Sequence, residues 1–309
     1  MVIVNMRSSA RVALVTGGTD GIGRAVALQL AAGGDRVIFV GRDEERGAQV
    51  LTELRATRPG VQHVYLQADL SLLAETARVA QAVGEHTQRL DAVVCCAGVL
   101  STQPELTREG LDRTFVLNYL SRYLLVWRLL PSLLLSPSGR LVLVANAGKY
   151  PDTLDLIDLH LRRAKPGLHV SGRTQFANDL LATELAERVR GTRVEVTCVF
   201  PGLVRTNVFR NARGLPAFAR ALATLLQPLI AIPPDRAALT PAYLAQNPAA
   251  TGINGAFFGP NRKQIPLPPR VLRRDRRMAL WDVSHALVRE YLADTHPGHD
   301  EPGLFVVNR

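Results

Sequence analysis

A glycine-rich segment near the start of the chain has the residue types and spacing that hold phosphate groups. It follows an apolar run at residues 12–15 and precedes the helical spacing of apolar residues at 22–32. Glycines let a backbone turn sharply and approach a pyrophosphate, and the N-terminus of the following helix offers N–H groups and a positive dipole. This context predicts a dinucleotide site. The residues expected to form it are Gly17, Thr19, Asp20, Gly21, Ile22 and Gly23.

The end of the second predicted strand, at residues 37–40, indicates which dinucleotide binds. An acidic residue there would hold a ribose 2′-hydroxyl, whereas an arginine accommodates a 2′-phosphate. The chain has Gly41 where the acid would stand, and Arg42 follows it. Arg42 can make a charge-assisted contact with phosphate. NADPH is therefore the preferred cofactor, with NADH as the second choice. The alternative is that Arg42 pairs with Asp43 or faces solvent.

Strand and helix patterns alternate along the chain and predict the framework that positions these residues. Such alternation gives a parallel sheet with helices on both faces, and runs rich in Val and Leu fit strands buried on both sides. We expect an α/β fold, a Rossmann-type doubly wound parallel seven-stranded sheet. Its strands are predicted at residues 12–15, 37–40, 61–66, 92–95, 140–144, 194–199 and 254–258. Its main helices are predicted at 22–32, 44–57, 72–83, 106–135, 174–189 and 276–292.

The chain is expected to hold one catalytic domain at residues 11–290, between an N-terminal extension at 1–10 and a C-terminal tail at 291–309. Near the end of this domain, at about residues 205–247, several prolines interrupt the strand–helix pattern. A long insertion of this kind is uncommon unless it is functional. We expect a helical lid over the substrate site; the alternative is a surface excursion that only adds bulk.

Composition limits the other classes of function. The 309 residues carry a net charge of +10 with 6% aromatic residues, and no stacking platform for nucleic acid is visible. The basic cluster at 270–277 is interpreted as a solvated surface, and a positive field would also attract a dinucleotide. The apolar runs are shorter than the roughly 18 residues of a membrane helix, and the start does not resemble a signal peptide. Three cysteines without metal-type spacing argue against a metal site. We expect a cytoplasmic protein with no membrane or nucleic-acid partner.

These motifs resemble the short-chain dehydrogenases/reductases over about residues 10 to 290, and the segments 251–258 and 280–284 resemble the retinol-dehydrogenase-like branch. The resemblance implies that Asn118 is the asparagine of the active site. It also implies cofactor contacts outside the glycine-rich turn. Among them, the Val204 backbone and Thr206 would hold the nicotinamide carboxamide. These further contacts are Asp69, Leu70, Ala97, Gly98, Pro201, Gly202, Val204 and Thr206.

The same resemblance shows three substitutions in the catalytic set. In this family a tyrosine donates a proton to the carbonyl oxygen, a lysine lowers the pKa of the tyrosine, and a serine holds the carbonyl. Here Ser171 stands for the tyrosine, Gln175 for the lysine and Asn146 for the serine. Serine is a poor acid, and neutral glutamine does not lower the pKa of a neighbour by its charge. Asn146 can still donate a hydrogen bond to a carbonyl oxygen.

A slow hydride transfer remains feasible with this set. Loss of general acid catalysis costs on the order of 10²–10⁴ in rate, while positioning of the reactants still supplies roughly 7–11 kcal/mol. The proton could come from a hydroxyl beside the ketone of the substrate, from an ordered water or from a relocated side chain. Four side chains lie near these positions in the sequence. Tyr150 is the best placed of them because it follows the fifth strand, whereas Tyr119, Tyr123 and His169 fit structural roles better.

The combination resembles the atypical angucyclinone ketoreductases of the kind found in simocyclinone biosynthesis, which reduce a ring ketone of a polycyclic aromatic scaffold with NAD(P)H. The predicted function is therefore an atypical NADPH-dependent ketoreductase of such a small-molecule ketone. Two alternatives stay open: a catalytically inactive regulatory protein that binds NADP(H), and a non-redox cyclase or epimerase. The family often dimerises through the helices predicted at 106–135 and 174–189, so the chain is expected to be a monomer or a homodimer.

Overall fold

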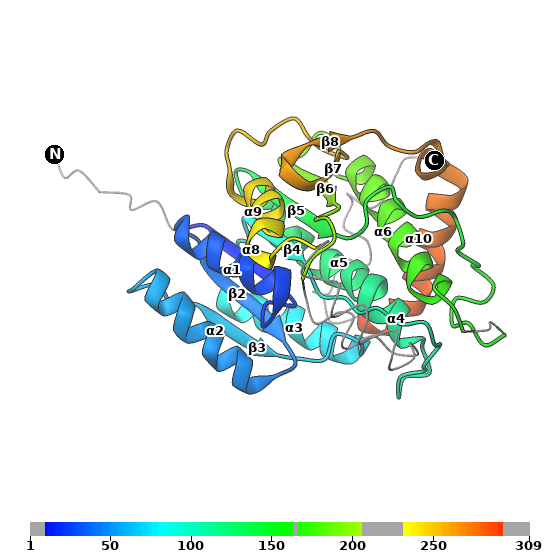
Figure 1. Cartoon of the computed structure of the whole chain (residues 1–309), viewed down its shortest axis with the longest axis horizontal. Coiled ribbons are helices and arrows are strands. Elements are labelled where there is room, and N and C mark those ends of the chain that lie inside the picture. Colours follow the sequence, from blue (N-terminus) through cyan, green and yellow to red (C-terminus); the bar gives the residue numbers. More distant parts are fainter. Residues whose placement is uncertain (1–9, 164–165, 206–230, 293–309) are drawn as a thin grey trace.

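An eight-stranded sheet forms the centre of the computed structural model, and helices cover both of its faces (Figure 1). The structure describes residues 10–163, 166–205 and 231–292. The predicted N-terminal extension and tail therefore lie almost wholly outside the described residues. The strand order is β3-β2-β1-β4-β5-β6-β7-β8, so the order reverses between β1 and β4. Ligands of such sheets bind at this reversal, outside the carboxyl ends of the strands.

Seven of the strands are parallel, which confirms the predicted doubly wound α/β sheet. The eighth, β8, pairs antiparallel with β7 and was not predicted, because its two residues carry no apolar run. The strands are β1 (Val12–Thr16), β2 (Arg36–Gly41), β3 (Val64–Gln67), β4 (Ala92–Cys95), β5 (Gly139–Val144), β6 (Val194–Val199), β7 (Phe257–Phe258) and β8 (Gln264–Ile265).

Each face of the sheet has its own apolar core, because alternate residues of a strand point to opposite sides. Leu14 and Val93 belong to one core, and Val15 and Val94 to the other. The first face packs on α3 (Leu73–His86), α5 (Ser121–Leu134), α6 (His169–Arg188) and α10 (Arg274–Val288). The second packs on α1 (Gly21–Ala32), α2 (Glu44–Thr57) and α9 (Leu239–Gln246). Among the helices of the described ranges, none is long and apolar enough to cross a membrane.

The helix predicted at residues 106–135 starts later than its apolar pattern indicated. Gly110 has a φ of 74°, in a turn before the helix begins. Asp112 then caps α4 (Arg113–Phe115), accepting a hydrogen bond from the Phe115 N–H at 2.8 Å. A π-helical segment, η1 (Val116–Leu120), joins α4 to α5. Such segments often mark functional sites, and this one carries Asn118.

The predicted lid is only partly within the described residues. Residues 206–230 lie outside them, whereas 234–246 form α8 (Pro234–Ala237) and α9. Both helices pack on α1, and α9 also contacts β4 and β5, with Ala242 and Leu244 in the core. Residues 234–246 thus belong to the body of the domain rather than to a lid. Most of the buried residues of α9 are small or apolar, which allows this helix to pack closely against the sheet.

The basic cluster at 270–277 is only in part the solvated surface that we expected, because Arg273 and Arg274 are exposed whereas the other three arginines contact the rest of the fold. Arg270 donates to backbone carbonyls of the loop after β5, Arg276 pairs with Asp152, and Arg277 pairs with Glu184. Helix α10 itself lies along α6 (Figure 1) and buries Trp281 against Tyr123 of α5. These arginines tie the C-terminal helix to α6 and to the loop that follows β5.

Candidate cofactor and active site

The glycine-rich turn after β1 is packed so closely that only glycine fits at two of its positions. Gly17 has a φ of 68°, and a Cβ there would lie 2.9 Å from the Cα of Ala97. A Cβ on Gly23 would lie 2.2 Å from the carbonyl oxygen of Gly17. The turn, the start of α1 and the end of β4 therefore meet backbone against backbone. This is the close approach that a dinucleotide-binding turn requires.

Thr19 and Asp20 complete the turn by contacts with the end of β2 and with α2. A Cβ on Gly41 would lie 2.3 Å from the Cγ2 of Thr19, so a side chain at position 41 would require Thr19 to move. Asp20 caps α1, accepting from the Gly21 N–H at 2.7 Å, and it pairs with Arg46 at 3.1 Å. With Thr19 in this position, the end of β2 has no room for an acidic side chain at position 41.

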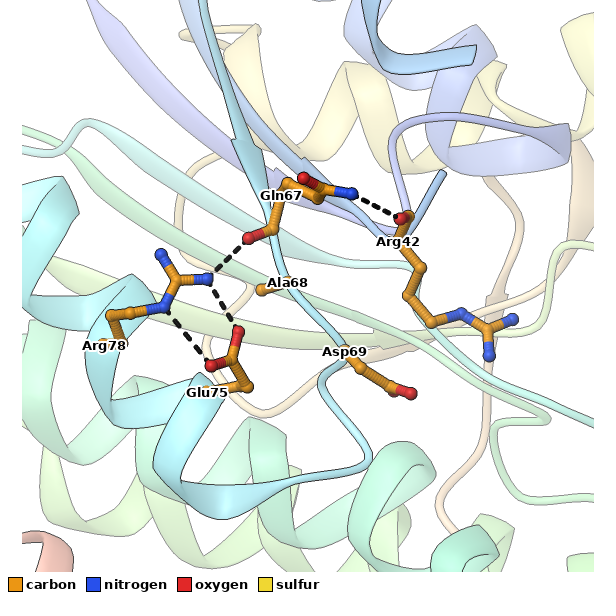
Figure 2. A pocket seen from close by; sticks show the side chains of 6 residues that line it. All are labelled: Arg42, Gln67, Ala68, Asp69, Glu75 and Arg78. Carbon is orange, nitrogen blue, oxygen red and sulfur yellow. Dashed lines mark hydrogen bonds and ion pairs between the residues drawn. The ribbon is translucent and has the colours of Figure 1, made fainter. Parts of the chain in front are cut away.

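Arg42 lines a surface pocket of about 430 Å³ at the end of β2 and β3 (Figure 2). The other lining residues are Gln67, Ala68, Asp69, Glu75 and Arg78. Arg78 pairs with Glu75 at 2.7 Å, and in Figure 2 the Arg42 side chain extends on the side of the pocket away from this pair. In the described part of the chain, no ion pair includes Arg42.

Of the two alternatives for Arg42, the structure does not contain the pair with Asp43, whereas the Arg42 side chain is exposed to solvent as the other alternative expected. Asp43 caps α2 by accepting from the Arg46 N–H at 3.0 Å, and it pairs with the Arg46 guanidinium. Across the pocket, Asp69 accepts from the N–H and hydroxyl of Ser71. Burial alone would raise the pKa of Asp69, but these hydrogen bonds and the charge of Arg42 outweigh it and hold the pKa below its usual value. The guanidinium of Arg42 is thus left available to an anionic ligand.

The end of β4 is held between the glycine-rich turn and η1. The Oγ1 of Thr16 accepts from the N–H groups of Cys96 and Ala97 at 3.1 and 3.2 Å. Asn118 binds both backbone groups of Val99, accepting from its N–H at 2.8 Å and donating to its carbonyl at 3.0 Å. The Asn118 amide also donates to Thr174 of α6 at 3.1 Å. Asn118 therefore joins the loop after β4 to α6.

Helix α6 presents a row of side-chain oxygens to the neighbouring loops, at spacings of four residues. Ser171 accepts from the Ser101 N–H at 2.7 Å, and Gln175 accepts from the Asn146 N–H at 3.0 Å. Asp179 accepts from the Gly148 N–H at 3.0 Å. We call Ser171, Gln175 and Asp179 the acceptor row. It brings the positions predicted for the catalytic set, Asn118 included, into one neighbourhood of the fold.

The hydroxyl of Ser171 is fully engaged. It also donates to the Ser101 carbonyl at 2.8 Å, and the side chain is buried. Helix α6 contains neither tyrosine nor lysine. The hydroxyl thus holds the loop after β4 in place. No side chain of α6 can donate a proton as a tyrosine would.

The loop after β5 is held from a second side by Arg270, which sequence reasoning did not assign to the site. Arg270 donates to the carbonyls of Gly148 and Tyr150 at 2.8 and 2.9 Å. The Tyr150 ring lies on α6, where a Cβ on Gly172 would be 3.0 Å from the Cδ1 of the ring. The Tyr150 ring therefore packs against the first turn of α6 at Gly172.

Asp179 was also missed, although its spacing of four residues from Gln175 was visible in the sequence. It is completely buried, and burial raises the pKa of its carboxyl to about 7, despite the Gly148 hydrogen bond, the Cys198 thiol and the charge of Arg270, which lower it. A group that titrates near neutral pH therefore lies directly under the loop that carries Asn146 and Tyr150.

Tyr119 and Tyr123 have the structural roles that the sequence favoured for them. The Tyr119 hydroxyl shares a hydrogen bond with Ser284 at 2.8 Å inside the core, and Tyr123 packs against Trp281. Burial raises the pKa of both tyrosines far above its usual value. His169 is the first residue of α6. Within residues 10–163, 166–205 and 231–292, no cluster of His, Cys, Asp or Glu could hold a metal ion.

The loop after β6 holds the two sides of the insertion together. Ile232 donates to the Leu203 carbonyl at 2.8 Å and accepts from the Arg205 N–H at 2.9 Å. Gly202, in the loop that would contact nicotinamide, has a φ of 94°. Thr206, the last of the predicted carboxamide contacts, lies outside the described residues. The insertion therefore leaves and returns to the same point beside the predicted nicotinamide site.

The chain belongs to the short-chain dehydrogenase/reductase family, whose members bind NAD(P). A profile of that family, described as short chain dehydrogenase, matches residues 11–153. Human retinol dehydrogenase 14 is 32% identical over 89% of this chain and 85% of its own length. Mouse polyprenol dehydrogenase is 34% identical over 88% of this chain and 82% of its own length. A short chain dehydrogenase from Shigella flexneri complexed with NADP superimposes with a TM-score of 0.62, at 27% identity over 81% of this chain and 96% of that one.

Proposed function

We propose that the protein is an NADPH-dependent ketoreductase acting on a polycyclic aromatic ketone, with the proton supplied by a hydroxyl of the substrate or by an ordered water. One observation carries the proposal. The glycine-rich turn keeps the packing that a dinucleotide needs, while the Ser171 hydroxyl is committed to the backbone of Ser101. NADPH, when bound, supplies hydride to the carbonyl carbon of the substrate. The chain itself binds and positions the cofactor and the substrate, and it stabilises negative charge on the substrate oxygen.

The preference for NADPH rests on Arg42 and its surroundings. Thr19 fills the space beside Gly41 that an acid for a ribose 2′-hydroxyl would occupy. Arg42 lines the adjacent pocket, where a 2′-phosphate would find a guanidinium that forms no ion pair with a described carboxylate. A charge-assisted contact of this kind contributes roughly 1.5–3 kcal/mol. That energy favours NADPH over NADH.

The character of the substrate is supported by apolar side chains at the carboxyl edge of the sheet. The loops that follow β4, β5 and β6 meet at this edge, where ligands of such sheets bind. They carry four large apolar side chains that are exposed: Leu106, Ile157, Leu168 and Leu203. Exposed apolar side chains on the loops of this edge would suit an apolar ligand. The relatives named for retinol and polyprenol also act on apolar molecules.

The residues around the reacting carbonyl would orient it rather than protonate it. Asn146 follows β5, and its amide is suited to donate a hydrogen bond to a carbonyl oxygen as negative charge develops there. Gln175 fixes the backbone of Asn146 from α6. A hydroxyl next to the ketone would hydrogen-bond to the same oxygen within the substrate. Tyr150, held against Gly172, is the remaining side chain to be tested as a donor.

A matched pair of substrates tests this proposal. Purified protein with NADPH is given a polycyclic ketone with a neighbouring hydroxyl, or its O-methyl ether, and NADPH absorbance and product mass are followed together. We expect the hydroxyketone to gain two hydrogens with equal loss of NADPH, and the ether to react about 10²-fold more slowly. The variant Tyr150→Phe should preserve this difference. A Tyr150→Phe variant that loses turnover of both substrates would instead make Tyr150 the donor.

The same assay separates the two other functions. Tight NADPH binding without consumption for any ketone of a broad panel would favour a regulatory NADP(H)-binding protein. A product formed without change in nicotinamide absorbance would favour a cyclase or an epimerase.

A further inference from the structure

Among the buried arginines of the described residues, one lacks the carboxylate partner that the other three have. Ion pairs hold Arg140 to Glu195, Arg173 to Asp112 and Arg188 to Glu184. Arg122 of α5 is 4% exposed, yet among the described residues no carboxylate pairs with it. Its guanidinium donates to the Ala97 carbonyl at 2.8 Å and to the Asn178 amide oxygen at 3.1 Å, both neutral acceptors. Its buried Nε has no hydrogen-bond partner within the described structure.

The neighbouring thiols do not neutralise this charge. Burial raises the pKa of Cys95 to about 11 and that of Cys96 to about 12, and it also raises the pKa of Cys198. All three are therefore neutral thiols near pH 7. Burial lowers the pKa of Arg122, but a guanidinium stays protonated in proteins. A buried cation without a charged partner lowers the stability of the folded protein. Such a group is therefore a candidate for a functional role.

The position of Arg122 connects this charge to the cofactor site. Its acceptor, Ala97, packs against Gly17 of the glycine-rich turn. A Cβ on the next residue, Gly98, would lie 3.9 Å from the Nη2 of Arg122 and 3.4 Å from the Oδ1 of Asn118. The guanidinium therefore lies against the residues that follow β4, Ala97 and Gly98, which also contact Gly17 and Asn118.

We propose that Arg122 supplies the cofactor site with a fixed positive potential that favours the reduced over the oxidised nicotinamide. The oxidised ring carries a positive charge and the reduced ring is neutral, so a buried cation close to the site disfavours NADP⁺ relative to NADPH. The same potential stabilises negative charge on the substrate oxygen as it forms. With no lysine on α6, the charge comes from α5 instead. This inference rests on the proposed binding of NADP(H).

The affinities of the two cofactor forms test the inference without any ketone. Dissociation constants of NADPH and NADP⁺ are measured by calorimetry for the wild type and for Arg122→Met and Arg122→Lys. The wild type is expected to bind NADPH more tightly than NADP⁺. In Arg122→Met the ratio of the two constants should shift towards NADP⁺ by about fivefold or more, because a charge–charge repulsion is removed. Arg122→Lys should keep the ratio of the wild type.

Arg128, on the same helix, provides the matched control. Its guanidinium donates to the Tyr291 carbonyl at 2.7 Å, and Arg128→Met should leave the ratio unchanged. A purely structural role for Arg122 would weaken both affinities equally and overturn the inference. If Arg122→Met does not fold, the wild type alone still tests the inference. Binding of NADP⁺ by the wild type that is as tight as, or tighter than, its binding of NADPH would refute it. Failure of both nucleotides to bind the wild type would instead refute the proposed function.

Discussion

Replacement of Asp179 by asparagine should stabilise the protein at neutral and alkaline pH, and the stabilisation should disappear as the pH falls towards 4. The carboxyl is completely buried on α6, where it accepts the Gly148 N–H at 3.0 Å and contacts the Cys198 thiol at 3.7 Å. The amide oxygen of asparagine can accept the same Gly148 hydrogen bond. The Asp179→Asn variant therefore keeps the loop contact and removes the cost of a buried negative charge.

The size of the effect follows from the shift in pKa. Burial raises the pKa of Asp179 from its ordinary value of 3.8 to about 7, and one unit corresponds to about 1.4 kcal/mol. Because the pKa is raised in the folded state, the full stability is present below about pH 4 and is lost as the pH rises towards 7. Above pH 7 the wild type carries a penalty of about 4 kcal/mol. The variant carries none.

Urea unfolding, followed by the fluorescence of the buried Trp127 and Trp281, measures this difference. At about pH 8 the variant should exceed the wild type by up to about 4 kcal/mol, and at about pH 4.5 by only about 1 kcal/mol. Asp282→Asn, on the exposed face of α10, is the matched control and should change little at either pH. A stabilisation that does not depend on pH, or a variant less stable than the wild type at about pH 8, would refute the reasoning.

Two substitutions address the cofactor and the Ser171 hydroxyl. Arg42→Ala should weaken NADPH binding about 10- to 100-fold while NADH binding changes less than about threefold; equal loss for both nucleotides would remove Arg42 from the 2′-phosphate site. Ser171→Ala leaves the buried Ser101 backbone without its partner, so the free energy of unfolding should fall by about 1–3 kcal/mol. Turnover of that variant should stay within about tenfold of the wild type, and a loss near 10³-fold would show that Ser171 takes part in proton transfer.

The parallel framework and the glycine-rich turn could be predicted from the sequence because both depend on short-range patterns. Runs of Val and Leu, followed by glycines and then helical spacing, are specified within about 30 residues of chain. The errors also have local causes. Gly110 and the cap at Asp112 cut short a helix whose apolar pattern continued across them. The two residues of β8 carry no pattern to detect.

The site itself depends on contacts that no local pattern contains. Ser171 and its partner Ser101 are separated by 70 residues, and Arg270 lies 122 residues beyond the Gly148 carbonyl that it binds. Arg122 has an unremarkable place in a helical pattern, and only its surroundings reveal a buried charge without a carboxylate. Sequence reasoning could therefore propose positions for the active site, but the side chains that hold the neighbouring loops could be identified only from the fold.

The acceptor row explains how α6 can serve the site without a tyrosine or a lysine. Ser171, Gln175 and Asp179 lie on one face of the helix, and each accepts a backbone N–H from the loop after β4 or after β5. These loops carry the groups that would surround the reacting carbonyl. General acid catalysis is worth on the order of 10²–10⁴ in rate, whereas positioning can supply roughly 7–11 kcal/mol. In the proposed mechanism, a helix that holds both loops in place would retain the larger contribution and leave the smaller one to the substrate.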